Sequence, residues 1–213
     1  MPLDSYHHFT KRPAPGSRLV FTFHGTGGNE RQFTNLVEQI LPDAGIVSPL
    51  GDVSERGARR FFRRRAEGVY DMDDLALRTA KMTDFIRAHA EANPGAPLHG
   101  LGYSNGANIL ASVVFEAPEL FERVVLMHPL IPWTPEPEPA LRSLDLLITA
   151  GRRDPICPLP QTEALVRYFE QQGAKVSLQL HEGGHETMPQ ELAAIADFLR
   201  AADAAGRSAD GGN

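Results

Sequence analysis

Short apolar segments alternate with longer amphipathic segments through most of the chain, from residue 18 to residue 200. The apolar runs are nearly continuous, which is typical of strands in a sheet that is covered on both faces. The segments between them repeat their apolar residues with helical spacing. Parallel strands joined through helices have right-handed crossovers and form a doubly wound sheet. The sequence therefore predicts an α/β fold, with a doubly wound, mostly parallel sheet flanked by helices.

The expected elements follow from these periodicities. Strands are predicted at residues 19–23, 44–48, 98–103, 123–127, 144–150 and 175–181, with an extra edge strand around residues 6–9. Helices are predicted at residues 31–41, 73–92, 105–115, 161–172 and 189–202. Irregular structure is predicted at residues 49–70 and 129–139. We predict one domain over residues 1–203 and a disordered tail over residues 204–213, because this tail is small and polar.

Composition narrows the class of protein. The chain has 213 residues, 42% of them hydrophobic, and a formal net charge of −6. A nucleic-acid-binding protein usually has a strongly basic face, so no nucleic-acid partner is expected. No window approaches the ~20 apolar residues that span a bilayer, and the first residues lack the pattern of a signal peptide. We expect a cytoplasmic protein without a membrane span, and the sequence is compatible with a homodimer.

One pentapeptide stands where a strand should turn into a helix. Gly102-Tyr103-Ser104-Asn105-Gly106 matches G-x-S-x-G, between an apolar run and a helix of small residues. Glycines suit this position because the turn is tight and side chains would clash there. The turn projects the serine hydroxyl above the strand ends and points N–H groups at a developing oxyanion. One alternative is a glycine-rich turn whose serine has no catalytic role. The other is a dinucleotide-binding fingerprint, but the glycines here do not have its spacing.

A serine nucleophile needs a base, and the base needs an acid that orients it. Asp154 follows the strand predicted at residues 144–150, and His185 follows the strand predicted at residues 175–181. The carboxyl ends of parallel strands share one edge of the sheet, so both side chains should lie near Ser104. We therefore expect Ser104, Asp154 and His185 to be the catalytic residues, in the order that hydrolases with this turn use.

Each of these assignments has a rival interpretation. Asp154 precedes a proline, where an aspartate commonly forms only a turn, and Asp145 is excluded because it begins its strand. His185 could be a surface loop histidine, and His181 is the rival base, although it ends a strand. His181-Glu182-Gly183-Gly184-His185 also matches H-E-x-x-H, which binds zinc only on a helix. Each of the two glycines costs ~1 kcal/mol of helix propensity, so no metal site is expected.

The loop after the first predicted strand supplies the remaining part of the site. Phe23-His24-Gly25-Thr26-Gly27-Gly28-Asn29 stands where folds with this serine turn provide one oxyanion-binding N–H. By position we assign the backbone N–H groups of Thr26 and Asn105 as the oxyanion hole. Losing one such donor costs about 2.7–4 kcal/mol of transition-state stabilisation. A phosphate-binding loop is the alternative, but the lysine of a P-loop is missing, so no cofactor is expected.

Together the motifs resemble those of the phospholipase/carboxylesterase family of the α/β-hydrolase superfamily. The resemblance covers nearly the whole chain and is carried by His24-Gly25-Thr26-Gly27-Gly28, Gly102-Tyr103-Ser104-Asn105-Gly106, Asp154-Pro155 and Gly184-His185. The family includes acyl-protein thioesterases and small bacterial carboxylesterases, and Arg59-Arg60-Phe61-Phe62-Arg63-Arg64 is similar to the bacterial branch. The resemblance implies a compact hydrolase without a large lid domain and without a cofactor. Thr26 replaces the usual leucine and Asn105 the usual glutamine, which favours small esters over protein deacylation.

The expected function is cleavage of small-molecule carboxylic esters, or of thioesters, through an acyl-enzyme on Ser104. The alternatives are an acyltransferase that uses the same acyl-enzyme and a non-catalytic binding protein with a hydrolase fold. Cys157 is the one cysteine, so no internal disulfide can form, and it has no base of its own. We expect it to be a buried apolar group. The arginine-rich loop at residues 56–65 is expected to be a solvated face or, alternatively, to guide anionic substrates.

Overall fold

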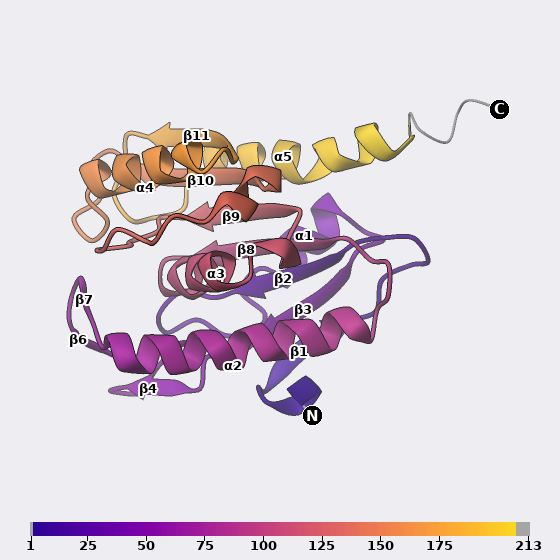
Figure 1. Cartoon of the computed structure of the whole chain (residues 1–213), viewed down its shortest axis with the longest axis horizontal. Coiled ribbons are helices and arrows are strands. Elements are labelled where there is room, and N and C mark those ends of the chain that lie inside the picture. The colour runs from indigo at the N-terminus through magenta and orange to yellow at the C-terminus, as the bar shows by residue number, and fades with distance from the viewer. Residues whose placement is uncertain (1, 208–213) are drawn as a thin grey trace.

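In the computed structural model, which describes residues 2–207, a seven-stranded sheet has the order β1-β3-β2-β8-β9-β10-β11 (Figure 1). Its strands are β1 (His8–Lys11), β2 (Leu19–Phe23), β3 (Gly45–Pro49), β8 (Leu98–Tyr103), β9 (Arg123–Met127), β10 (Asp145–Gly151) and β11 (Lys175–His181). β1 pairs antiparallel with β3, and all other neighbours are parallel. The predicted α/β fold with a doubly wound, mostly parallel sheet is confirmed, including its extra edge strand.

Helices cover both faces of this sheet. The helices are α1 (Thr34–Ile40), α2 (Met72–Glu91), α3 (Asn105–Glu116), α4 (Leu159–Gln171) and α5 (Pro189–Arg207). Short 3-10 turns lie at η1 (Pro2–Asp4), η2 (Pro118–Leu120) and η3 (Pro139–Ser143). α2, α3 and α4 pack against one face, because their buried side chains share one apolar cluster, and α1 and α5 share the cluster on the other face. No helix within residues 2–207 is long and apolar enough to cross a membrane.

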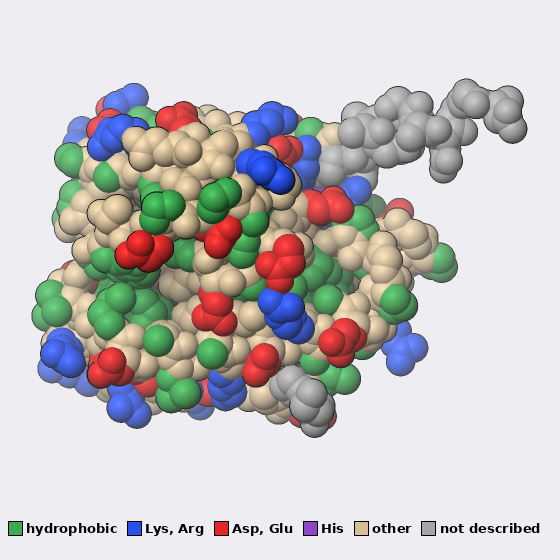
Figure 2. Space-filling view, in the orientation of Figure 1, with side chains coloured by type: hydrophobic (Ala, Val, Ile, Leu, Met, Phe, Trp, Pro, Cys, Tyr) green, Lys and Arg blue, Asp and Glu red, His purple; other side chains and the backbone are tan. Residues whose placement is uncertain are grey.

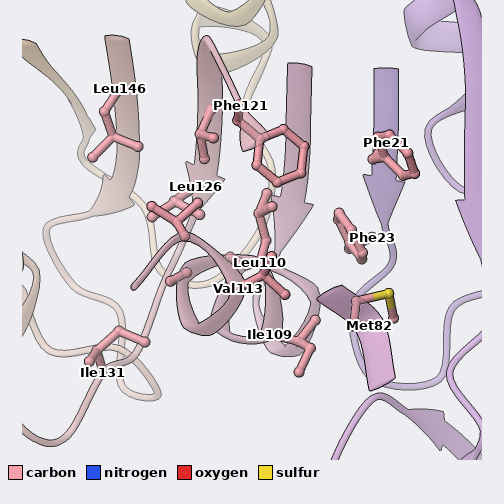
Figure 3. Close-up of a cluster of buried hydrophobic side chains, with 14 of the residues drawn as sticks. Phe21, Phe23, Met82, Ile109, Leu110, Val113, Phe121, Leu126, Ile131 and Leu146 are labelled. Atoms are coloured by element: carbon pink, nitrogen blue, oxygen red, sulfur yellow. The ribbon is translucent and has the colours of Figure 1, made fainter. Parts of the chain in front are cut away.

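The larger apolar cluster lies between the sheet and the helices α2 and α3. Figure 3 shows Phe23 of β2 beside Met82 of α2, with Phe21 farther along the same strand and Leu110 of α3 packed under the sheet, and all four are fully buried. Burying a side chain of this size contributes ~1.5–3 kcal/mol. Because α3 begins directly after Ser104 and its residues 105–114 are buried, the turn before it rests on the core of the fold.

The segment at residues 49–70 differs from its predicted irregular structure. It forms two small antiparallel pairs, β4 (Val53–Glu55) with β5 (Ala58–Arg60) and β6 (Arg64–Ala66) with β7 (Val69–Tyr70). Glycines with positive φ, at 90° and 67°, make the turn within each pair. The prediction missed these strands because each is only two or three residues long, and β5 and β6 are rich in arginine.

The ends of two helices also differ from the sequence prediction. α1 begins at Thr34 instead of residue 31, because the side chain of Asn29 accepts a hydrogen bond from the Arg31 N–H at 2.8 Å and forms a turn there. α5 extends to Arg207, and the tail predicted for residues 204–213 lies, from residue 208 onward, outside the described residues.

Candidate active site

Ser104 occupies a strained turn at the C-terminal end of β8. Its backbone has φ 52° and ψ −118°, a conformation that residues other than glycine rarely adopt. The neighbouring strand holds the turn, because the Ser104 N–H donates to the Met127 carbonyl at 2.8 Å. A Cβ on Gly106 would lie 2.3 Å from the carbonyl oxygen of Phe23, so a glycine lets α3 approach the end of β2. The geometry is that of a sharp strand-to-helix elbow.

The structure brings the three residues predicted to be catalytic into one hydrogen-bonded array. The Ser104 hydroxyl donates to His185 Nε2 at 2.8 Å, and His185 Nδ1 donates to Asp154 Oδ2 at 2.7 Å. Asp154 follows β10, and His185 lies between β11 and α5, so all three residues meet at the carboxyl edge of the sheet. In this arrangement the imidazole can take the serine proton while the carboxylate fixes its tautomer.

The carboxylate of Asp154 accepts four hydrogen bonds and is fully buried. Its Oδ1 accepts from the backbone N–H groups of Ile156 and Cys157 at 2.8 and 2.9 Å, and its Oδ2 accepts from His185 and from His128 Nδ1 at 2.9 Å. Burial raises the pKa of this carboxyl, but the hydrogen bonds from the two histidines and the two amides outweigh burial and hold the pKa well below its usual range. Asp154 is therefore an oriented anion.

A second set of polar side chains lies behind Asp154, and the sequence analysis did not assign it. His128 follows β9 and is fully buried, and its Nε2 lies 3.1 Å from Glu191 Oε1. His181 Nε2 lies 3.4 Å from the same nitrogen of His128. Glu191, also fully buried, accepts a further hydrogen bond from the Thr149 hydroxyl. The sequence signal that could have identified this set is the position of His128, which follows a predicted strand at the same sheet edge as Asp154.

His128, His181 and Glu191 also lie close enough together to be considered as cation ligands. However, His181 Nδ1 accepts a hydrogen bond from the Gly183 N–H at 3.0 Å, so the proton of a neutral His181 is on Nε2. This Nε2 is the atom that faces the other two residues, and a nitrogen that ligates a metal must be unprotonated. His181 Nε2 is therefore a donor, and the acceptor that it faces is Glu191 Oε2 at 3.8 Å. His181 ends β11 and His185 lies in the following loop, so the two do not share a helix face as in a zinc motif.

A pocket of about 290 Å³ opens beside Ser104 and has the two predicted oxyanion donors, Thr26 and Asn105, in its wall. Within residues 2–207 neither the backbone N–H of Thr26 nor that of Asn105 donates a hydrogen bond. Two free N–H groups next to the serine can bind an oxyanion without breaking another contact. Thr26 and Asn105 therefore both lie at the pocket, and their role as oxyanion donors is part of the proposal below.

Part of the arginine-rich loop forms a wall of this pocket instead of a solvated face. Arg60 is 3% exposed and donates through Nη1 to Thr26 Oγ1 at 2.8 Å. It also pairs with Glu55 at 3.3 Å, and burial lowers the pKa of its guanidinium group. Asn105 Oδ1 accepts from the Phe61 N–H at 2.8 Å, which ties the same segment to the serine elbow. The prediction of a solvated face was therefore wrong for Arg60, whose neighbours Phe61 and Phe62 anchor the loop in the core.

A second, apolar hollow of about 330 Å³ lies near the first turns of α2. Its lining includes Met72 and Leu75 of α2, Phe115 of α3 and Trp133. Figure 2 shows hydrophobic side chains gathered around a hollow on the left of the molecule, where α2 begins. The Trp133 ring lies 6.1 Å from the ring of Tyr70, which lines the pocket beside Ser104. This aromatic pair therefore lies between the two hollows.

Cys157 and Asp145, which the sequence analysis did not assign to catalysis, have structural roles in the described chain. Cys157 is 1% exposed, and its thiol donates to the His128 carbonyl at 3.1 Å. Burial raises the pKa of this thiol, which disfavours the nucleophilic thiolate. Asp145 begins β10 at the opposite edge of the sheet, where it pairs with Arg123 at 2.8 Å.

The doubly wound sheet, the strained serine elbow and the Ser104–His185–Asp154 array define an α/β-hydrolase. No family model matches the chain. Its sequence is 37% identical over 187 residues to MhqD of Bacillus subtilis, whose name assigns it provisionally to the hydrolases, with 86% of this chain and 93% of MhqD covered. The chain belongs to the carboxylesterase family of α/β-hydrolases and is a hydrolase of carboxylesterase type.

Solved structures support the same family. The crystal structure of a carboxylesterase from Bacillus cereus is 31% identical, covers 92% of this chain and 94% of its own, and has a TM-score of 0.87. A protein of unknown function from Agrobacterium tumefaciens is 52% identical, with a TM-score of 0.91 over 94% of this chain and 98% of its own. These similarities extend across nearly the whole chain, so the family assignment does not depend on the serine motif alone.

Proposed function

We propose that the chain hydrolyses carboxylic esters of small molecules through an acyl-enzyme on Ser104. The observation that carries the proposal is the array in which the Ser104 hydroxyl donates to His185 Nε2 at 2.8 Å, beside a pocket of about 290 Å³. A serine is a weak nucleophile without an adjacent base, and an oriented imidazole supplies that base. Membership of the carboxylesterase family supports ester cleavage as the reaction.

In the first half-reaction Ser104 Oγ attacks the ester carbonyl carbon and its proton passes to His185 Nε2. The carbonyl oxygen becomes negative and accepts hydrogen bonds from the Thr26 and Asn105 backbone N–H groups. The tetrahedral intermediate then expels the alcohol, which takes the proton from His185, and leaves an acyl group on Ser104. Asp154 remains ionised throughout and stabilises the imidazolium.

In the second half-reaction His185 takes a proton from water, and the oxygen of this water attacks the acyl carbon. The second tetrahedral intermediate collapses, the acid leaves, and the proton returns to Ser104. A thioester would follow the same steps with a thiol as the leaving group. If an alcohol or amine replaced water, the same acyl-enzyme would give acyl transfer, and product analysis with an added nucleophile distinguishes this second function.

Replacement of the serine tests the proposal. Ser104→Ala should abolish hydrolysis of p-nitrophenyl esters and labelling by a fluorophosphonate probe. Ser143→Ala removes an exposed hydroxyl from η3 and should leave both unchanged. A Ser104→Ala variant that keeps parental turnover would contradict the acyl-enzyme, and a parent chain that neither turns over esters nor reacts with the probe would favour a binding protein. A panel of esters and thioesters of graded acyl length then defines the substrate.

A further inference from the structure

His128 has a strained backbone like that of Ser104. Among the described residues other than glycine, positive φ values occur at Arg56, Ser104 and His128, with 51°, 52° and 49°. Arg56 lies in an exposed turn, whereas Ser104 and His128 follow the neighbouring strands β8 and β9. A buried side chain on such a backbone persists only where its surroundings hold it, and strain of this kind concentrates at functional sites.

Contacts on every side hold His128 in place. Its backbone N–H donates to the Thr149 carbonyl at 2.9 Å, and its own carbonyl accepts from the Cys157 thiol at 3.1 Å. Its ring nitrogens face two carboxylates, with Nδ1 at 2.9 Å from Asp154 and Nε2 at 3.1 Å from Glu191. A neutral imidazole donates through one nitrogen only, so both contacts are satisfied together by the imidazolium.

The groups around the ring favour this positive charge. The titratable groups that face His128 are Asp154, Glu191, His181, His185, Tyr103 and Cys157. Burial lowers the pKa of His128, but the hydrogen bonds to Asp154 and Glu191 outweigh burial and raise the pKa to about 9. The Glu191 carboxyl, whose pKa burial would raise, has its pKa lowered by His128 and Thr149. At neutral pH one buried cation therefore lies between two buried anions.

We propose that His128, held as an imidazolium between Asp154 and Glu191, is a positioning residue that keeps Asp154 ionised and oriented toward His185. The inference rests on the proposed function of Ser104, because it acts through the base of that reaction. His128 shares Asp154 Oδ2 with His185, so it prevents the carboxylate from rotating while His185 accepts and returns a proton. Its positive charge also lies close to the imidazole of His185, with the centroids of the two rings 5.1 Å apart.

Two substitutions of the same residue separate its two contacts. In His128→Asn the side-chain amide can take the place of Nδ1 and still donate to Asp154, but the charge is lost. In His128→Gln the amide lies nearer the place of Nε2, so it can reach Glu191 but not Asp154. We expect kcat of His128→Gln to fall about 10- to 100-fold, the fold-change for loss of a hydrogen bond to a charged group, with KM within about twofold. His128→Asn should keep kcat within about fivefold of the parent.

The pH profile provides a readout that a purely structural role would not change. The acid limb of the kcat/KM profile reports the essential base of the free enzyme. The midpoint of this limb should move to higher pH in His128→Asn, because a cation close to the base is gone. Glu191→Gln should move this midpoint less, because the change removes an anion as well as the positive charge that this anion stabilises on His128. His99→Asn is the matched control, since His99 is another fully buried histidine, in β8, and should leave the profile unchanged.

The outcomes are decisive in either direction. Graded upward shifts in the order parent, Glu191→Gln, His128→Asn, with the larger kcat loss in His128→Gln, support the proposal. Parental profiles in both Glu191→Gln and His128→Asn overturn it, as does equal activity of the two His128 variants. If a His128 variant does not fold, the Glu191→Gln profile alone decides. An active, probe-labelled parent with unaffected variants refutes this inference only, whereas a parent without turnover or labelling also refutes the proposed function.

Discussion

The Tyr103 hydroxyl donates a hydrogen bond to the backbone carbonyl of His185 at 2.6 Å. The two rings also lie against each other, with centroids 5.4 Å apart and planes inclined by 33°. The residue before the proposed nucleophile therefore holds the loop that carries the proposed base. Because β8 and the β11–α5 loop are far apart in sequence, this contact fixes the serine and the histidine relative to each other.

Removing this phenol should loosen the base without unfolding the chain. A neutral hydrogen bond contributes ~1 kcal/mol, so Tyr103→Phe should lower kcat/KM about fivefold. Tyr168→Phe is a matched control, because the Tyr168 hydroxyl donates to the Glu136 carbonyl at the same 2.6 Å, away from Ser104. Ester kinetics and thermal unfolding of both variants check the prediction. Equal losses of activity in the two variants would show that the effect is general destabilisation.

The orientation of the Asp154 carboxylate predicts that an isosteric substitution of this residue strongly lowers kcat. Asp154→Asn keeps the size of the side chain but can donate to His185 Nδ1, which then holds the wrong tautomer. The expected loss in kcat is about 10⁴-fold, as for the corresponding change in a serine protease triad. Asp145→Asn, at the opposite sheet edge, should leave kcat unchanged, and steady-state ester hydrolysis measures both. Parental activity of Asp154→Asn would rule out its proposed role.

Much of the fold and of the array could be predicted because both depend on local patterns. The alternation of strands and helices implied a parallel sheet, and its shared carboxyl edge placed Asp154 and His185 near Ser104. The structure brings these residues within hydrogen-bonding distance, while their catalytic roles remain a proposal. The loop at Thr26 was assigned by the same topological argument.

The rest depends on contacts that local patterns do not encode. His128 and Glu191 are distant in sequence, and a histidine after a strand does not indicate whether both its nitrogens face carboxylates. Arg60 lies in a run of arginines, which is typical of a solvated loop. Its burial follows from the position of the neighbouring Phe61 and Phe62 in the core. These residues can be recognised only when the packing of the sheet edge is known.

The close approach of α3 and β2 predicts a strong effect at Gly106. A Cβ there would lie 2.3 Å from the Phe23 carbonyl oxygen and 2.5 Å from that of His24. Both are backbone atoms of a buried strand end, so Gly106→Ala should displace the elbow, lower the melting temperature and remove ester hydrolysis. Gly16→Ala is the contrast, because Gly16 has a positive φ but a Cβ on it would have no atom within 4 Å, and it should cost only ~1 kcal/mol and leave hydrolysis unchanged. Thermal unfolding and kinetics of the two variants distinguish a clash from backbone strain.

The burial of Cys157 predicts an unreactive thiol. Its side chain is 1% exposed and burial raises the pKa of the thiol, so DTNB should not react with the native chain and should react with it in urea. Iodoacetamide should leave ester hydrolysis intact, whereas a fluorophosphonate should remove it. Rapid DTNB reaction in the native state, together with loss of hydrolysis, would instead point to a cysteine nucleophile.

The charge of His128 also predicts how stability depends on pH. The pKa of His128 is raised from 6.5 to about 9 in the folded chain, so its contribution to the free energy of unfolding is fully present below pH 6.5 and is lost as the pH rises through 9. The Glu191 carboxyl has a lowered pKa, so its contribution is present above its unfolded pKa and is lost as the pH falls through the lower folded value. Urea unfolding of the parent and of His128→Asn at pH 6, 7.5 and 9 measures the difference. Groups far from His128 titrate alike in both proteins, so their effects cancel, and the stability advantage of the parent should shrink steadily toward pH 9. An advantage that stays constant over this range would mean that His128 is neutral in the folded chain.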